Sequence, residues 1–196
     1  MDSTKGLMIA VLTIAVALLL LFTLPRLLDP EPEVEESYTF NYFEFYKTDG
    51  VWYSQAKVND KLVRISLRNG PKDLVTIPVE GDIRSFGKNS FFYIAFDPSE
   101  EVHNKYVTMA NAELSTNLVS HFNKRLLPAC TVEHPDCEST NTTVLTCEST
   151  QLPMIYLDQG GMPGINIEGN CATISGTDDD LVRAADRFMY AMYGIM

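Results

Sequence analysis

An uncharged apolar run from Leu7 to Leu24 (LMIAVLTIAVALLLLFTL) constrains this chain more than any other feature of its sequence. A helix over these residues extends roughly 27 Å, which is just enough to cross the hydrocarbon layer of a bilayer. The run is apolar on every side, unlike the amphipathic helices that pack on a soluble core. We therefore predict a cytoplasmic amino terminus over residues 1–6, a transmembrane helix over 7–28 and a folded domain beyond it.

The residues that precede the run leave two alternatives to a permanent anchor. Lys5 is typical of the basic start of a secretory signal, but the apolar run is long for one and no A-x-A-like cleavage site follows it. Lys5-Gly6 followed by Leu7 resembles the leader of archaeal and bacterial pilins, which is cut after the glycine. Cleavage there would leave the apolar helix attached, and the helix would then pack into the core of a filament.

Four cysteines indicate the compartment of the folded domain. Their even number, in a segment rich in Ser, Thr and Pro, favours paired disulfides, which need an oxidising environment. Proximity in sequence favours Cys130 with Cys137 and Cys147 with Cys171, although four cysteines allow three pairings. A zinc site that includes His134 is the alternative, but the spacing lacks the tight ligand pairs of structural zinc sites. We therefore place the domain outside a cell membrane that the chain crosses once.

Two further features agree with that orientation. Residues 29–37 form an acidic, proline-containing linker, and Asn141 begins an Asn-Thr-Thr sequon that would carry a glycan on an extracellular loop. Thirteen basic and 25 acidic residues follow residue 28, which gives this part a net charge of −12. Such a charge disfavours binding to nucleic acid. The expected partners are the lipid bilayer and, beyond it, other envelope proteins or copies of the chain itself.

Residues 38–196 predict one α+β domain with antiparallel β-sheet and two main helices. Alternating polar and apolar residues predict a meander of three strands over 38–46, 51–58 and 62–68, joined by turns at Asp49-Gly50 and Asn59-Asp60. Apolar spacings of three and four predict a helix over 106–122, and a second helix after Gly176. Residues 126–150 are expected to form a disulfide-stapled loop with one strand at 142–147. Shorter strands are expected at 75–79, 91–96, 154–157, 165–167 and 171–175.

The last helix has the clearest start signal. Thr177 is expected to be its N-cap, with the hydroxyl accepting from the amide of Asp180 while the Asp180 side chain reaches back. Acidic residues from Asp178 to Asp180 would occupy the first turn, where carboxylates favour the positive end of the helix dipole.

The segment Gly169–Met196 (GNCATISGTDDDLVRAADRFMYAMYGIM) resembles the C-terminal segment of uncharacterised single-pass membrane proteins of small-genome archaea. A looser similarity surrounds Phe96-Asp97-Pro98 and Ala112-Glu113-Leu114. The resemblance implies an archaeal surface protein, and it brings no activity with it.

No motif in the sequence predicts catalysis or a cofactor. His103, His121 and His134 stand in no nucleophile motif and are expected at the surface, and the glycines from Gly160 to Gly164 predict a turn and no phosphate loop. Aromatic residues crowd the first hairpin, and we expect one aromatic face to serve an interface or, alternatively, to be buried within the domain. The interface candidates are Tyr42, Phe43, Phe45 and Trp52.

These features favour a non-catalytic binding or assembly role in the cell envelope. One alternative is a pilin-like filament subunit cleaved after Gly6, and the other is an envelope enzyme or an accessory subunit of a membrane complex.

Overall fold

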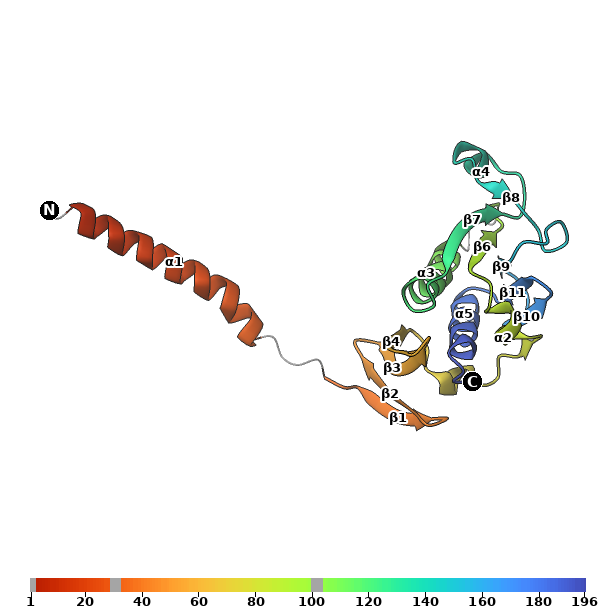
Figure 1. Ribbon diagram of the computed structural model, residues 1–196, viewed down its shortest axis with the longest axis horizontal. Helices are drawn as coiled ribbons and strands as arrows, with labels where there is room; N and C mark the ends of the chain where they lie inside the picture. Colours follow the sequence, from red (N-terminus) through yellow and green to blue (C-terminus); the bar gives the residue numbers. More distant parts are fainter. Residues whose placement is uncertain (1–2, 29–32, 100–103) are drawn as a thin grey trace. The chain divides into compact units, whose positions relative to one another are not determined.

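The computed structural model describes residues 3–28, 33–99 and 104–196, and within the first helix it describes the side chains of residues 6, 8 and 11–21 (Figure 1). The chain divides into two compact units, one ending at Glu33 and the other running from Val34 to Met196. Residues 1–2 of the predicted cytoplasmic segment and 29–32 of the predicted linker lie outside the described residues, as does His103.

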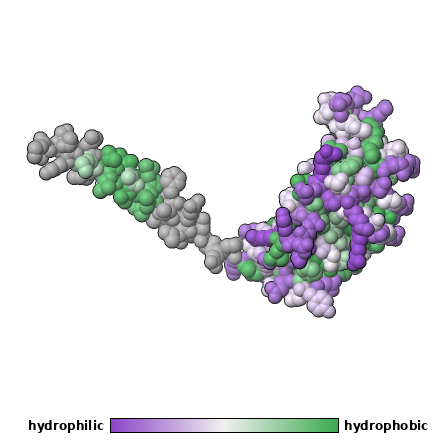
Figure 2. All heavy atoms as spheres, viewed as in Figure 1, coloured by the Kyte–Doolittle hydropathy of each residue, from purple (hydrophilic) through white to green (hydrophobic). Residues whose placement is uncertain are grey.

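The first unit is built on a single helix, α1 (Ser3–Leu28). All of its described side chains are exposed, and Figure 2 shows the described part of this helix as a continuous hydrophobic surface. Within the described ranges, no helix combines the length and apolarity that a membrane crossing requires.

The second unit begins with an antiparallel sheet of four strands, which confirms the predicted antiparallel meander. Its strands are joined in sequence order by three two-residue turns, and all six turn residues have positive φ, as in type I′ hairpins. The turns at Asp49-Gly50 and Asn59-Asp60 were predicted, whereas Asn41-Tyr42 was not, because a tyrosine rarely adopts positive φ. The single strand predicted over 38–46 is therefore wrong. The four strands are β1 (Glu36–Phe40), β2 (Phe43–Thr48), β3 (Val51–Val58) and β4 (Lys61–Leu67).

A second sheet of seven strands follows, and it differs from the antiparallel prediction. Its order is β5-β10-β11-β9-β6-β7-β8, and every neighbouring pair except the β10–β11 hairpin is parallel. Strand β7 lies in the region predicted as a loop. The sequence did not predict this strand because Pro128 interrupts its short apolar pattern. The strands are β5 (Val79–Glu80), β6 (Phe91–Phe96), β7 (Arg125–Cys130), β8 (Thr143–Val144), β9 (Met154–Asp158), β10 (Gly164–Glu168) and β11 (Cys171–Ser175).

Two long helices, α3 (Asn104–Ser120) and α5 (Asp179–Met192), form a layer between the sheets and confirm the two predicted main helices (Figure 1). The Tyr190 ring of α5 meets Phe45 of the meander edge-on at 5.7 Å. On its other side, α5 packs against β11. One continuous hydrophobic core thus joins all three layers. Short helical segments complete the domain, namely a 3-10 turn η1 (Pro71–Leu74), α2 (Ile83–Phe86) and α4 (Pro135–Ser139).

The opposite face of the seven-stranded sheet is covered by the chain that links β7 to β9. A small core of Ala95, Ala129, Met154 and Cys171 lies there, with Leu145 and Cys147 packed against it. Disulfides join Cys130 to Cys137 and Cys147 to Cys171, with Cα atoms 6.5 and 5.5 Å apart. The predicted disulfides are confirmed, and the zinc alternative is wrong because all four thiols are used. Within the described ranges, no cluster of metal-ligating side chains occurs.

Candidate functional site

The carboxyl ends of β6, β7 and β9 meet at one edge of the seven-stranded sheet, because these neighbouring strands run parallel. From β6 the chain passes through α3 to β7 on one side, while β9 leads to β10 and β11 on the other. In open parallel sheets, ligands bind where the connections diverge in this way. Phe96 pairs with Leu157 in the register, so Asp97, just after β6, and Asp158, the last residue of β9, follow these two neighbours at this edge.

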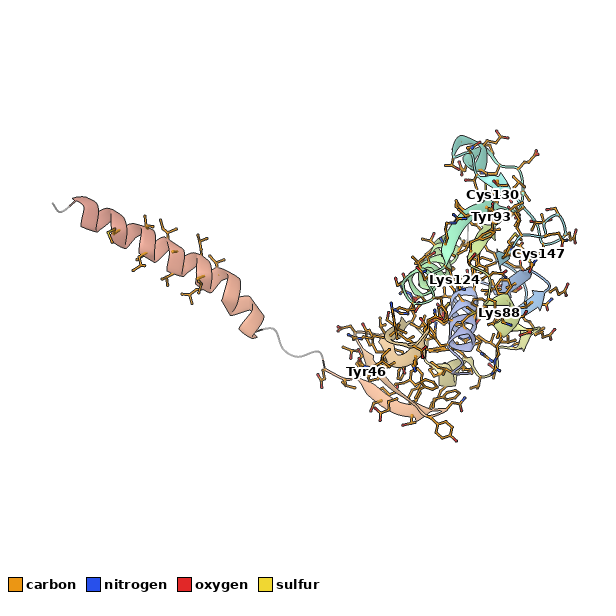
Figure 3. The ribbon with its side chains drawn as sticks, viewed as in Figure 1. Tyr46, Lys88, Tyr93, Lys124, Cys130 and Cys147 are labelled. Atoms are coloured by element: carbon orange, nitrogen blue, oxygen red, sulfur yellow. A yellow bond between two sulfur atoms is a disulfide. The ribbon has the colours of Figure 1, made fainter. Side chains whose placement is uncertain are left out.

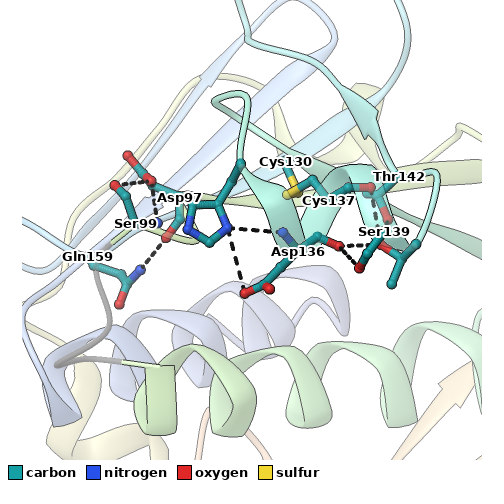
Figure 4. Close-up of a disulfide and its surroundings, with 10 residues drawn as sticks. Asp97, Ser99, Cys130, Asp136, Cys137, Ser139, Thr142 and Gln159 are labelled. Carbon is teal, nitrogen blue, oxygen red and sulfur yellow. Dashed lines mark hydrogen bonds and ion pairs between the residues drawn. A yellow bond between two sulfur atoms is a disulfide. The ribbon is translucent and has the colours of Figure 1, made fainter.

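Hydrogen bonds fix the polar groups at this carboxyl edge. Asp97 Oδ1 accepts from the backbone nitrogen of Ser99 at 2.9 Å and from its hydroxyl at 2.6 Å. The Gln159 side-chain amide donates to the Asp97 carbonyl at 3.2 Å (Figure 4). Gln159 is buried, and its Oε1 has no hydrogen-bond partner in the described part of the chain. A buried acceptor of this kind is costly in free energy unless a donor satisfies it, and such groups gather at functional sites.

The Cys130–Cys137 disulfide holds the loop after β7 at the same edge. Cys130 ends β7 and Cys137 lies in α4, where the His134 side chain caps the helix by accepting from the Asp136 backbone nitrogen at 3.3 Å. Figure 4 shows the disulfide beside Asp136, with Asp97 and Gln159 in the same region. His134 is half-buried, so the prediction of a surface histidine is only partly met.

Two cavities flank this edge, one on each face of the sheet. The first, of about 480 Å³, lies on the helix side between α3 and the loop after β7, and Cys130 and Cys137 are among its walls. The second, of about 400 Å³, lies on the opposite face, and we call it the sheet-face pocket. Its polar walls come from two carboxylates, three threonines and a tyrosine, which are Asp97, Glu148, Thr131, Thr146, Thr173 and Tyr156; Cys147 lies beside them.

The sheet-face pocket has the chemistry of a site for hydrogen-bond donors. Ionised carboxylates only accept hydrogen bonds, and threonine hydroxyls both donate and accept. Its described lining contains no basic side chain, so an anion would meet two negative groups without a compensating charge. The volume lies in the range of small-molecule sites, which combine an apolar wall with a few oriented polar groups. The pocket therefore favours ligands that donate hydrogen bonds, hydroxyl groups among them, and disfavours anions.

A second polar group lies in the core between α5 and the meander. Asp186 is fully buried, and its Oδ2 accepts from the backbone and side-chain nitrogens of Asn69, both at 2.9 Å. Desolvation raises the pKa of this carboxyl well above its usual value, and the nearby charge of Glu113 raises it further. Glu113 itself pairs with Arg68 at 2.8 Å. The Asp186 bonds attach α5, and the Glu113 pair attaches α3, to the residues that follow β4.

The predicted cap of the last helix is wrong. The helix begins at Asp179, its N-cap residue is Asp178, and the Thr177 hydroxyl donates to the Gly161 carbonyl at 3.4 Å. The Asp180 carboxylate instead accepts from Arg183 at 2.7 Å, one turn further along. Asp178 has a φ of 55°, and the Asp180 amide donates to the backbone carbonyl of Thr177 at 3.1 Å instead of to its hydroxyl.

The four aromatic residues predicted as an interface do not share one surface. Phe45 and Trp52 are buried in the core, Phe43 is half-buried, and Tyr42 is fully exposed at the tip of the first turn. The alternative prediction, in which the aromatic residues are buried within the domain, is therefore correct for Phe45 and Trp52. Asn141 lies in an exposed turn, and its glycosylation remains a prediction.

His121 is half-buried, contrary to the expected surface position. Its Nδ1 lies 2.5 Å from the Tyr193 hydroxyl, which donates to Asn117 Oδ1 at 2.7 Å. Burial lowers the pKa of His121 and raises that of Tyr193. This chain of bonds joins the ends of α3 and α5 and serves the packing of the two helices.

A comparison with family models, with curated proteins and with solved structures finds no match to this chain. The candidate site therefore rests on geometry alone. Sequence reasoning missed Asp97 and Gln159 as site residues, although each follows a correctly predicted strand. The missing signal was the parallel pairing of those strands, which brings their carboxyl ends together.

Proposed function

We propose that the chain is a membrane-anchored protein of the cell envelope, whose domain lies outside the membrane and binds a neutral, hydroxyl-rich ligand such as a glycan without converting it. The observation that carries the proposal is that both disulfides border cavities at the carboxyl edge of the parallel sheet. Disulfides persist in oxidising compartments, and here they hold the loops that form the pocket walls.

The anchor is supported by the apolar run from Leu7 to Leu24 and by the division of the chain into two compact units, with α1 in the first. The test is fractionation of native cells, followed by protease treatment of intact cells. An anchored outer domain stays with membranes after an alkaline wash and is cleaved from outside. Recovery in the soluble fraction, or protection from external protease, would contradict the proposal.

N-terminal sequencing of the same material separates the anchor from the pilin-like alternative. A mature chain that begins at Leu7 favours a filament subunit, and an intact Met1 favours a permanent anchor.

Ligand binding is tested by titrating the full chain in detergent with a panel of neutral oligosaccharides. Glu148→Gln and Thr131→Val each remove one polar wall of the sheet-face pocket, and each is expected to weaken binding roughly tenfold. Glu138→Gln is the matched control, since Glu138 is exposed and lies outside that pocket. Equal losses in all three variants, or no binding by the wild type, would reject this pocket as the site.

Mass spectrometry of the titrated sugars then tests the enzyme alternative. Recovery of unchanged sugars agrees with binding alone, while chain shortening would favour an envelope enzyme that uses the adjacent Asp97 and Asp158.

A further inference from the structure

A basic cavity lies at the amino edge of the parallel strands, opposite the candidate site. Its volume is about 320 Å³, and its walls include four cationic side chains, Lys57, Arg84, Lys88 and Lys124. The segment with Arg84 and Lys88 leads into β6, and Lys124 leads into β7. Figure 3 labels Lys88 and Lys124 close to α5, whose final turn also lines the cavity. We call this cavity the amino-edge pocket.

The concentration of positive charge here runs against the composition of the domain. Of the 13 basic residues that follow residue 28, four line this one cavity, although acidic residues outnumber basic ones by 25 to 13 in that part of the chain. The described lining contains no acidic side chain. The carboxyl ends of α3 and α5 lie nearby and favour cations. The partial negative charge of those helix ends accounts for part of this attraction, and it is smaller than the charge of the four side chains.

The two cations at the pocket mouth are available to a ligand. Arg84 and Lys88 are exposed, and within the described residues neither forms an ion pair. The Asp82 carboxylate caps α2 by accepting from the backbone nitrogens of Arg84 and Ser85, both at 3.0 Å. That cap fixes the short helix that carries Arg84.

The other two cations are held by contacts within the domain. Lys124 Nζ donates to the Asn89 carbonyl at 2.6 Å, which fixes the ammonium group, and burial lowers the pKa of Lys124. Lys57 is paired with the exposed carboxylate of Asp60 at 2.9 Å, so it contributes less of its charge. An anion in the pocket would therefore meet two free cations and one fixed ammonium group.

The remaining walls are apolar. Phe122 and Met192 contribute partly buried side chains, and Val58 and Ile83 line the same cavity. Oriented cations beside an apolar wall suit a ligand that has one compact anionic group on a less polar body. Arginine and lysine together are typical of phosphate recognition.

We propose that the amino-edge pocket binds a phosphate monoester or diester through Arg84, Lys88 and Lys124. The ligand is either a small soluble phosphate ester or the glycerol phosphate headgroup of a lipid, since both present phosphate oxygens that carry negative charge. This site is independent of the sheet-face pocket, whose carboxylates disfavour anions.

The test uses the full chain in neutral detergent at constant ionic strength, titrated with inorganic phosphate and with glycerol 1-phosphate. Arg84→Gln and Lys88→Gln each remove an exposed cation and are expected to weaken binding roughly tenfold. Lys61→Gln is the matched control, because Lys61 is an exposed cation outside the pocket, and its affinity should stay within about twofold of wild type.

Short-chain phosphatidylglycerol added to the same micelles distinguishes the two sources of phosphate. Tighter binding of the lipid than of glycerol 1-phosphate, lost in Lys88→Gln, identifies a headgroup site, and the reverse order identifies a soluble ester. Equal losses in Lys61→Gln would show general charge attraction and overturn the proposal. Absence of binding to all three phosphates would also overturn it, whatever the result of the sugar titration.

Discussion

The two faces of the seven-stranded sheet are stabilised in different ways. The face towards the helices buries large side chains, such as Phe92, Ile94 and Ile155, against α3 and α5 in one continuous core. The other face has a core of only four buried residues under an irregular loop, and the Cys147–Cys171 disulfide attaches that loop, whereas the Cys130–Cys137 disulfide borders the cavity on the helix side. Where helices cover a sheet, apolar burial suffices, and where a polar loop covers it, covalent links replace the missing burial.

Truncation of a side chain on the helix face should have the largest effect on stability. Phe188→Ala removes a fully buried ring that meets Phe86 edge-on, and we expect a loss of about 4 kcal/mol in the free energy of unfolding. Urea denaturation monitored by the single tryptophan, Trp52, measures it. Val119→Ala, at an exposed position of α3, should change stability by less than about 0.5 kcal/mol. If Phe188→Ala lowers the free energy of unfolding by less than the removal of either disulfide does, apolar burial is not the larger source of stability.

Removal of the disulfides should destabilise the domain in the order of the loops that they close. Chain entropy gives about 3.5 kcal/mol for the Cys147–Cys171 link and about 2.5 kcal/mol for the Cys130–Cys137 link. Their sequence separations are 24 and 7 residues. Paired Cys→Ser variants, compared by the same urea titration, measure both values. If reduction of the wild type leaves its unfolding midpoint unchanged, the loop face does not depend on covalent links.

Substitution of the glycine in the turn between β11 and α5 should have an intermediate effect on stability. A Cβ on Gly176 would lie 2.6 Å from the carbonyl carbon of Asp180 and 2.6 Å from the nitrogen of Leu181. Both atoms are backbone at the start of α5, so Gly176→Ala must displace the helix, at a cost of about 2 kcal/mol. Gly160→Ala is the control, since its nearest neighbour would be 3.6 Å away. Similar thermal midpoints for the two variants would show that α5 moves freely at this junction.

The buried carboxyl on the helix side should make a smaller, pH-dependent contribution. Because the pKa of Asp186 is raised in the folded state, the native domain holds this proton more tightly than the unfolded chain does. The corresponding stability is present below the pKa of the unfolded chain, which is about 4, and is lost as the pH rises through the pKa of the folded state. The stability of Asp186→Asn relative to wild type should therefore increase as the pH is raised from acid to neutral.

Denaturation of both proteins at matched pH values measures the difference. The exposed Asp49→Asn variant, taken through the same series, should show no such trend. A constant difference between Asp186→Asn and wild type would contradict the pKa assignment.

The sequence predicted elements that depend on neighbouring residues and missed those that depend on distant ones. Alternation and turn residues predicted both ends of β3 and β6 correctly, and the apolar stripe predicted the position of α3. Parallel pairing has no local signal, because β6, β7 and β9 are joined by long connections. The site at Asp97 and Gln159 exists only through that pairing. The pairing of the cysteines could be predicted, since each cysteine lies close in sequence to the one with which it forms a disulfide.

The central position of α5 has a consequence for the order in which the domain matures. This helix is synthesised long after the meander, yet Phe45 packs on it and the Asn41 side chain donates to the Ile195 carbonyl at 2.8 Å. Until residues 179–195 emerge, the aromatic meander lacks its main packing partner. A nascent chain therefore leaves Phe45 without this packing partner until α5 is synthesised, and such exposed apolar surface favours aggregation during that interval.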